Sequence, residues 1–291
     1  MHHHLTRRNL LIALASLPMA RAGAASPRVR VACLDWALAE TMLALESTPL
    51  GVVAASDWSR FVVEPALPPQ VADLGLEQDI NFELLATIRP DLILTSPFLE
   101  NFEPQLRRIA PVLNLSIYED DGPPLARREA VTRTVAQHIG RTGEVEHLLM
   151  QAGQSLAADR ERIARLPRYP LLIATFIDAR HLRVYGGASL FQNVLRRLGL
   201  ENAWSGPVGY FGFATVGVER FADAGNVHFV AFNPLPPDVA PALKQSTLWE
   251  RLPFVRAGRV SMLPPVLPFG AMPAAVRFAR LLTSALEKAA A

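Results

Sequence analysis

The chain has 291 residues, of which 50% are hydrophobic and 19% are charged. This composition is typical of a globular protein with a sizeable core, and it excludes a disordered chain. The single cysteine, Cys33, excludes a disulfide framework and a cysteine-based zinc site. The formal net charge of +2 is too small for a nucleic-acid-binding protein.

The first 25 residues have the order of an export signal. Arg7 and Arg8 precede an apolar run that is too short to span a bilayer, and small residues follow it. The arginine pair resembles a twin-arginine signal, which an export receptor reads. The alternative is a buried N-terminal helix with two incidental arginines. Without Arg7, Arg8 and Arg21, 26 basic and 27 acidic residues remain, so we expect a near-neutral protein that the export machinery delivers to the periplasm.

Apolar runs and helical patterns alternate through residues 26–123. This alternation predicts a parallel α/β sheet and therefore an N-terminal lobe. Strands are expected at 29–34, 52–55, 92–94 and 112–117, and helices at 37–45, 82–88 and 106–109.

Residues 124–167 have a different pattern, which is charged and rich in alanine, leucine, arginine and glutamate. No proline lies between Pro124 and Pro167. Gly140 and Gly143 weaken the helical pattern without ending it. We expect a long connecting backbone helix, bent, or two abutting helices.

Residues 168–291 return to the alternation of strand and helix and predict a C-terminal lobe. The fold class is therefore α/β, with two lobes, each with a mainly parallel sheet, joined by a long helix and separated by a ligand cleft. Strands are expected at 171–175, 227–232 and 260–263, helices at 190–198 and 273–288, and a further apolar segment at 248–252.

Residues 80–94 and 216–230 form a weak internal repeat, which supports two lobes. Each copy has a glutamate, Glu83 or Glu219, followed by a helical pattern, a breaker and an apolar strand. A glutamate in the first helical turn favours the positive end of the helix dipole. Either the two glutamates only stabilise helices, or they present a matched pair of acidic contacts, one on each lobe.

Motifs of known catalytic chemistry are absent from the sequence. The segment 185–189 precedes a helix but lacks the lysine of a P-loop, and Ser189 is expected to be a helix N-cap. There is no Gly-x-Ser-x-Gly motif, and no helical histidine pair at metal-binding spacing. We therefore expect no catalytic residues, no protein metal ligands and no cofactor.

Aromatic residues gather in loop-like segments near predicted strand ends. Tyr210 and Phe211 lie between Gly209 and Gly212, and Phe269 lies between a proline and a glycine. Such contexts favour a cleft over a core for Phe211 and Phe269. The other loop aromatics fit a core equally well: Trp36, Trp58, Phe61, Phe98, Trp204, Tyr210 and Phe213.

Short segments along nearly the whole mature chain carry a family resemblance. They are 34–36 (Leu-Asp-Trp), 64–68 (Glu-Pro-Ala-Leu-Pro), 73–76, 81–85 (Asn-Phe-Glu-Leu-Leu), 108–111, 189–192, 202–204 and 253–259. In this order they resemble the helical-backbone substrate-binding proteins of ABC importers, and among these the periplasmic iron(III)-hydroxamate siderophore-binding proteins. The resemblance implies two lobes on a rigid backbone helix and delivery of an iron-loaded siderophore to an inner-membrane permease.

The resemblance also implies roles for individual residues. After Gly75 and Leu76, the resembled proteins have an arginine that binds the hydroxamate oxygens, whereas this chain has Glu77. Glu83 and Glu219 are expected to dock on the permease. The predicted ligand-binding residues are Trp58, Phe61, Glu77, Phe98, Leu99, Trp204, Tyr210, Phe211 and Phe269.

A carboxylate in place of an arginine lowers the local charge by two units, which favours a neutral or cationic complex. Alternatively, Glu77 turns outward or pairs with Arg60. The main expectation is a monomeric carrier of a ferric, hydroxamate-type siderophore, with the permease as its partner. The alternatives are a carrier of another metal chelate, such as haem or a corrinoid, and a periplasmic siderophore-processing enzyme.

Overall fold

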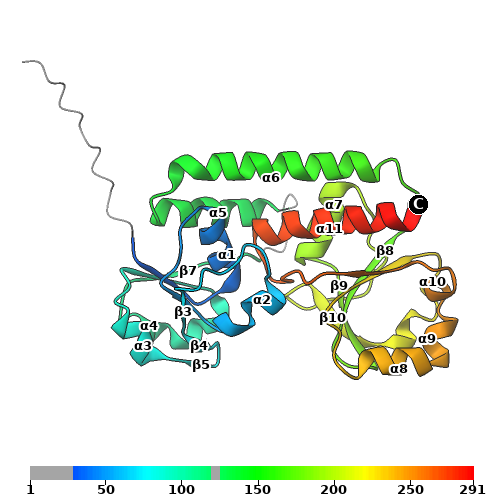
Figure 1. Cartoon of the computed structure of the whole chain (residues 1–291), viewed down its shortest axis with the longest axis horizontal. Helices are drawn as coiled ribbons and strands as arrows, with labels where there is room; N and C mark the ends of the chain where they lie inside the picture. The colour runs from blue at the N-terminus through cyan, green and yellow to red at the C-terminus, as the bar shows by residue number, and fades with distance from the viewer. Residues whose placement is uncertain (1–28, 119–124) are drawn as a thin grey trace, which may run out of the picture.

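The computed structural model describes residues 29–118 and 125–291, and the predicted leader lies outside these ranges. Two α/β lobes lie side by side along one long helix, α6 (Thr142–Ile163) (Figure 1). The C-terminal helix, α11 (Met272–Ala290), runs next to α6 from the middle of the molecule to the far end of the second lobe. The predicted two-lobe α/β fold is confirmed.

The N-terminal lobe contains a five-stranded parallel sheet in the order β3-β2-β1-β6-β7. The apolar runs of the sequence form its central strands because both faces of a parallel sheet are buried. The strands are β1 (Val31–Cys33), β2 (Gly51–Val52), β3 (Ala72–Asp73), β6 (Leu92–Thr95) and β7 (Val112–Asn114), with a separate hairpin, β4 (Gly75–Leu76) and β5 (Asp79–Ile80).

Short helices connect these strands. The helix expected at 106–109 instead begins at Glu103 and ends at Leu106. Pro104 lies in its first turn, where proline is favoured because the missing N–H would have no partner inside the helix. The helices are α1 (Trp36–Ala44), α2 (Trp58–Phe61), α3 (Phe82–Thr87) and α4 (Glu103–Leu106), with 3-10 helices η1 (Ala55–Asp57) and η2 (Pro97–Phe102).

The connecting segment contains two helices, α5 (Ala126–His138) and α6. Gly140 ends α5 in a left-handed conformation, with φ of 71°, and the Arg141 N–H donates to the Ala136 carbonyl at 2.7 Å. This is a Schellman cap, which reverses the chain so that α5 packs against α6. Of the two alternatives expected for this segment, a pair of helices is confirmed; Gly140 ends the first of them, contrary to expectation, and α6 alone connects the lobes.

The C-terminal lobe has a mixed sheet in the order β10-β9-β8-β11-β12. Strands β8, β11 and β12 are parallel as expected, whereas β9 and β10 are antiparallel and were not predicted. The elements are β8 (Leu171–Phe176), β9 (His181–Tyr185), α7 (Leu190–Leu198), β10 (Phe213–Gly217), η3 (Val218–Phe221), β11 (His228–Phe232), α8 (Val239–Gln245), α9 (Thr247–Arg251), α10 (Pro253–Arg256) and β12 (Val260–Leu263).

The internal repeat is present in a reduced form. Both copies place the glutamate in a first helical turn ahead of a parallel strand, β6 or β11. The first copy forms the six-residue helix α3, but the second forms only the 3-10 turn η3. Gly225, in a left-handed conformation, follows η3 closely and leaves no room for a longer helix.

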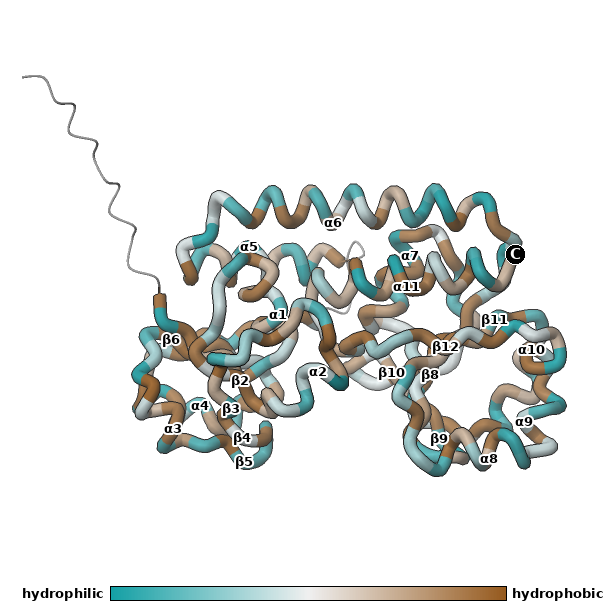
Figure 2. Tube along the Cα trace, in the orientation of Figure 1, coloured by the Kyte–Doolittle hydropathy of each residue, from teal (hydrophilic) through white to brown (hydrophobic). Residues whose placement is uncertain are grey.

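A continuous hydrophobic layer joins the two lobes. Buried residues of α1, α5, α6, α7 and α11 form one core cluster, which includes Leu38, Val135, Leu149, Val194 and Phe278. Helix α6 alternates hydrophilic and hydrophobic residues along its length, as an amphipathic helix on a core does (Figure 2). The helices therefore hold the lobes together as one packed unit.

Polar contacts reinforce this junction at the start of α11. The buried Glu40 carboxylate on α1 accepts from the Ala271 N–H at 2.5 Å, and Arg128 Nε of α5 donates to the Gly270 carbonyl at 3.0 Å. On the surface, Glu64 of the N-terminal lobe pairs with two arginines of α11, Arg277 at 2.5 Å and Arg280 at 2.6 Å.

Candidate ligand-binding cleft

Aromatic rings from the two lobes meet between the sheets. Phe98 of the N-terminal lobe stacks on Phe211 of the C-terminal lobe, with ring centroids 4.7 Å apart. Tyr118 contacts Phe211 at 5.3 Å and Tyr210 at 5.6 Å. Phe269 lies 6.2 Å from both Phe98 and Phe211. We call Phe98, Tyr118, Tyr210, Phe211 and Phe269 the aromatic cluster.

A tight glycine turn presents the two rings of the C-terminal lobe. The Gly212 N–H donates to the Gly209 carbonyl at 2.9 Å, and the Gly209 N–H donates to the Phe213 carbonyl at 3.0 Å. Gly212 has φ of 73°, and a Cβ there would lie 2.3 Å from the Ser189 nitrogen. Only glycine fits this position, so the turn is fixed with Tyr210 and Phe211 at its tip.

The carboxyl ends of the parallel strands of the N-terminal lobe supply the opposite side of the cleft. Asp35 and Trp36 follow β1, Phe98 follows β6, and Tyr118 follows β7. Glu77 occupies the turn between β4 and β5, just beyond β3. Ligands of open α/β sheets commonly bind at such strand ends.

A pocket of about 250 Å³ opens beside the aromatic cluster. Trp36 is held there by its indole N–H, which donates to the Val53 carbonyl at 2.7 Å. Arg60, considered as a partner for Glu77, lies instead over the ring of Phe61. The pocket is lined by Asp35, Trp36, Ala37, Glu77, Phe98, Leu267 and Phe269.

The two carboxyl groups of this pocket affect each other. Burial raises the pKa of Glu77, and the nearby Asp35 charge raises it further. Burial also raises the pKa of Asp35, against hydrogen bonds from Ser96 and from the backbone of α1. Two carboxyl groups next to three aromatic rings form an environment that attracts a cation.

Two further polar groups belong to the same region and were missed by the sequence reasoning. The hydroxyl of Tyr118 and Nη2 of Arg128 are buried, and neither has a hydrogen-bond partner among the described residues. Burial lowers the pKa of Arg128 to about 10 and raises that of the Tyr118 phenol. The position of Tyr118 after a predicted strand was a usable signal, whereas nothing in the sequence separates Arg128 from the neighbouring arginines, Arg127 and Arg133.

A family model described as "Periplasmic binding protein" matches residues 31–267. The iron(3+)-hydroxamate-binding protein FhuD of Escherichia coli (strain K12) is 33% identical over 288 residues, which cover 97% of each chain. The chain belongs to the periplasmic binding protein family. The resemblance inferred from the short segments is thereby confirmed.

Two solved structures share the fold. FhuD from Vibrio cholerae with bound Fe³⁺-Desferal has a TM-score of 0.85 and 25% identity, covering 91% of this chain and all of the other. FhuD2 from Staphylococcus aureus with bound ferrioxamine B has a TM-score of 0.71 and 17% identity, covering 90% of this chain and all of the other.

Five predicted ligand-binding residues of this periplasmic binding protein lie outside the aromatic cluster, and one of them, Glu77, lines the pocket beside it. Trp58 is 2% exposed, and its indole N–H donates to the Pro65 carbonyl. Leu99 is buried in the core of the N-terminal lobe. Trp204 packs on the core of the C-terminal lobe. Phe61 stacks on Trp36 at 6.1 Å and so borders the pocket.

The two predicted docking residues, Glu83 and Glu219, are both exposed and lie one on each lobe. The carboxylate of Glu219 folds against Gly217, where a Cβ would clash with it. Beside Glu219 is a surface hollow that Arg180, His181 and Leu248 help to line. Neither glutamate lines the pocket at the cluster.

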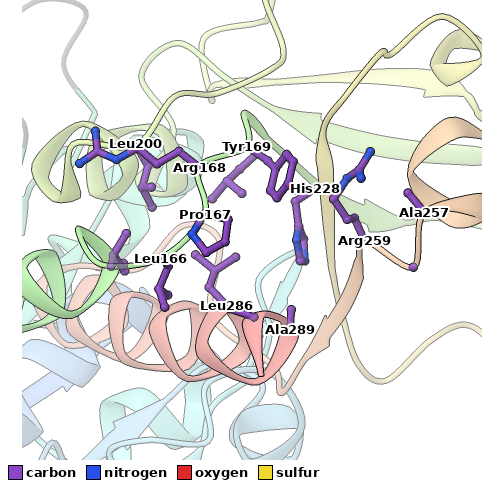
Figure 3. A pocket seen from close by; sticks show the side chains of 14 residues that line it. Leu166, Pro167, Arg168, Tyr169, Leu200, His228, Ala257, Arg259, Leu286 and Ala289 are labelled. Atoms are coloured by element: carbon purple, nitrogen blue, oxygen red, sulfur yellow. The ribbon is translucent and has the colours of Figure 1, made fainter.

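A separate cavity of about 290 Å³ lies where α6 and α11 end against the C-terminal sheet (Figure 3). Its centre is lined mainly by apolar side chains and the ring of His228, while the guanidinium of Arg168 points away. His228 Nε2 is 2.8 Å from the Ser261 hydroxyl. Throughout residues 29–118 and 125–291, no group of three His, Cys, Asp or Glu could hold a metal ion, and no helix has the length and apolarity of a membrane span.

Proposed function

We propose that this periplasmic binding protein carries a ferric, hydroxamate-type siderophore in the cleft between its lobes and delivers it to an inner-membrane ABC permease. Iron is the cargo and arrives already chelated. Aromatic burial of the chelate then supplies most of the binding free energy, and a few polar contacts orient it.

The observation that carries this proposal is the aromatic cluster. Its rings come from both lobes, Phe98 on one side and Phe211 on the other, and they touch across the cleft. A compact chelate inserted between such rings is contacted on two sides. Two relatives with the same fold are described with bound Desferal or ferrioxamine B, and both of these are hydroxamate chelates.

The pocket beside the cluster supports a preference among hydroxamate chelates. Glu77 and Asp35 face it together, and burial with mutual repulsion raises the pKa of Glu77. A bound ammonium group would relieve that repulsion and would lie near Trp36 and Phe98. We infer that the preferred chelate is neutral or carries an amine.

The remaining parts of the proposal concern delivery. Residues 1–25 act as a twin-arginine-type leader that directs the protein to the periplasm. There it acts as a monomer without enzymatic activity. Glu83 and Glu219 dock on basic residues of the permease, one on each half, since they are exposed on separate lobes.

The direct test is a titration of the purified exported protein with metal chelates. Trp36 lines the pocket, so its fluorescence reports on binding there, and calorimetry gives the affinity. The series is ferric desferrioxamine B, ferrichrome, a ferric catecholate, ferric citrate, haemin and cyanocobalamin, with iron-free desferrioxamine B as control.

We expect at least one ferric hydroxamate to bind at micromolar concentration or below, more tightly than its iron-free form. Failure of both hydroxamates would contradict the proposal. Binding of haemin or cyanocobalamin alone would assign a different cargo to the same cleft.

A further inference from the structure

Two polar atoms in the cleft region are buried without a hydrogen-bond partner in the part of the chain that the structure describes, and this is unusual. Among the described residues, only a few buried side-chain atoms lack a hydrogen bond, and these include the Tyr118 hydroxyl and Arg128 Nη2. Tyr118 is 7% exposed and Arg128 is 2% exposed. A buried donor without an acceptor destabilises the free protein, so an acceptor brought in from outside would be favoured there.

Tyr118 occupies the centre of the aromatic cluster. Its ring contacts all four other members, at centroid distances between 5.3 and 6.4 Å. Tyr185 offers a contrast, since it is also buried but its hydroxyl lies 3.1 Å from the Thr175 hydroxyl. The unpartnered hydroxyl therefore belongs to the tyrosine that touches the cleft.

Arg128 lies close enough that its charge and that of Tyr118 affect each other's pKa. Its Nε is anchored on the Gly270 carbonyl, directly after Phe269, while Nη2 has no hydrogen-bond partner within residues 29–118 and 125–291. Burial raises the pKa of the neighbouring Glu40 to about 8. Burial therefore favours the protonated form of Glu40, so this residue offsets the positive charge of Arg128 less than an exposed carboxylate would.

We propose that the Tyr118 hydroxyl and Arg128 Nη2 form a polar floor to the cleft and donate hydrogen bonds to an anionic oxygen of the bound chelate. This inference rests on the proposed function, since it takes the chelate as the ligand. The polar floor supplies hydrogen-bond donors to the chelate oxygens, which the carboxylate of Glu77 cannot do. Because Phe98 and Phe211 contact the Tyr118 ring, the chelate reaches the hydroxyl by displacing these two rings.

Tyr118→Phe tests the floor without removing any contact of the free protein. We expect the affinity for ferric desferrioxamine B to fall about tenfold, as for the loss of one charge-assisted hydrogen bond. The midpoint of thermal unfolding without ligand should stay the same or rise, because an unpartnered buried hydroxyl is removed.

Tyr185→Phe is the matched control, and it should show the opposite pattern. It removes a buried hydroxyl that has a partner, so the unfolding midpoint should fall while the affinity stays within twofold of the parent. Arg128→Lys, if folded by circular dichroism, should weaken binding in the same direction as Tyr118→Phe.

Three outcomes would overturn the inference while leaving the proposed function intact. The first is a parent protein that binds ferric desferrioxamine B and a Tyr118→Phe variant with affinity within twofold of it, in which case water alone fills the floor. The second is a Tyr118→Phe variant that loses stability as Tyr185→Phe does. The third is an equal loss of affinity in the two variants. If the parent binds no ferric hydroxamate, the proposed function itself fails.

Discussion

The two lobes supply different chemistry to the same cleft. The C-terminal lobe and the segment leading into α11 contribute rings: Tyr210, Phe211 and Phe269. The N-terminal lobe contributes the rings of Phe98 and Tyr118 but also two carboxyl groups, Asp35 and Glu77, that line the pocket. The difference suggests a division of labour, in which one lobe binds any compact chelate and the other selects among chelates.

The sheets explain this difference. In the N-terminal lobe all five strands of the main sheet are parallel, so several strand ends deliver side chains to one edge. In the C-terminal lobe two strands are antiparallel, and the cleft is reached by the single glycine turn ahead of β10. This tight turn presents only two side chains at its tip, and both of them, Tyr210 and Phe211, are aromatic.

The largest expected effect comes from removing a ring of the C-terminal lobe. Phe211 contacts four other aromatic residues, so Phe211→Ala should weaken binding of all ferric hydroxamates about 10- to 100-fold. Calorimetry with cationic and neutral chelates measures the loss. Phe102→Ala is the control, since it breaks a ring pair with Phe82 away from the cleft. A loss confined to one class of chelate would show that this lobe also selects.

Variants of the two docking glutamates test whether both lobes contact the permease through their outer surfaces. Glu83→Ala and Glu219→Ala should each lower iron uptake by cells several-fold, and the double variant about tenfold, because each removes an exposed carboxylate that meets the permease. Affinity for the chelate should not change, since neither residue lines the pocket. Reduced affinity in the isolated protein would place that residue in the cleft and end the docking proposal.

A smaller effect should follow from Glu77, as a test of selection by the N-terminal lobe. Ferric desferrioxamine B, with its free amine, should bind three- to tenfold more tightly than its N-acetylated form. Glu77→Gln should abolish the difference and Glu77→Arg should reverse it. Calorimetry on the two chelates measures the ratio, and an unchanged ratio in Glu77→Arg would remove Glu77 from the site.

The same preference should depend on pH. Only the ionised carboxylate attracts the amine, so the preference is present above the pKa of Glu77 and is lost as the pH falls through it. Because burial and Asp35 raise that pKa, the loss should occur at a higher pH than for an exposed glutamate.

The last prediction concerns stability rather than binding, at the place where the lobes meet. Burial raises the pKa of Glu40 from 4.5 to about 8, so the folded protein keeps a proton that the unfolded chain releases over this range. The contribution of this group to stability therefore declines as the pH rises between these two values. In Glu40→Gln that decline should disappear, which denaturant titrations at several pH values would detect. An equal decline in the variant would contradict the assignment.

Much of the fold could be predicted because it depends on local patterns. Apolar runs gave the central strands of both sheets, and Ser189 capped α7 at the expected residue, accepting from the Gln192 N–H. The antiparallel strands β9 and β10 were missed, because exposed charged residues such as Arg183 interrupt the apolar signal. Gly140 was misjudged, because a helix-ending glycine and a tolerated one look alike until the hydrogen bonds of the cap are seen.

The site was harder to predict because burial depends on distant contacts. Trp58 and Phe61 are three residues apart, yet one is buried and the other is 39% exposed. Phe98, Phe211 and Phe269 were expected to line a cleft, and the structure brings their rings together. The place of Arg128 near the cleft could not be predicted from local sequence, because the carbonyl that anchors it belongs to Gly270, more than a hundred residues further along the chain.

The paired helices across the junction have a consequence for the permease. With α6 running along both lobes, α11 packed on α6, and Glu64 fastening α11 to the N-terminal lobe, we expect empty and loaded carriers to have nearly the same outline. The permease then cannot distinguish the empty from the loaded protein by overall shape. The exposed apolar surface at the cleft entrance does change, because Phe98 and Tyr210 are 44% and 54% exposed and a bound chelate would cover them. The permease could thus distinguish the empty protein by the aromatic side chains exposed at the entrance of its cleft.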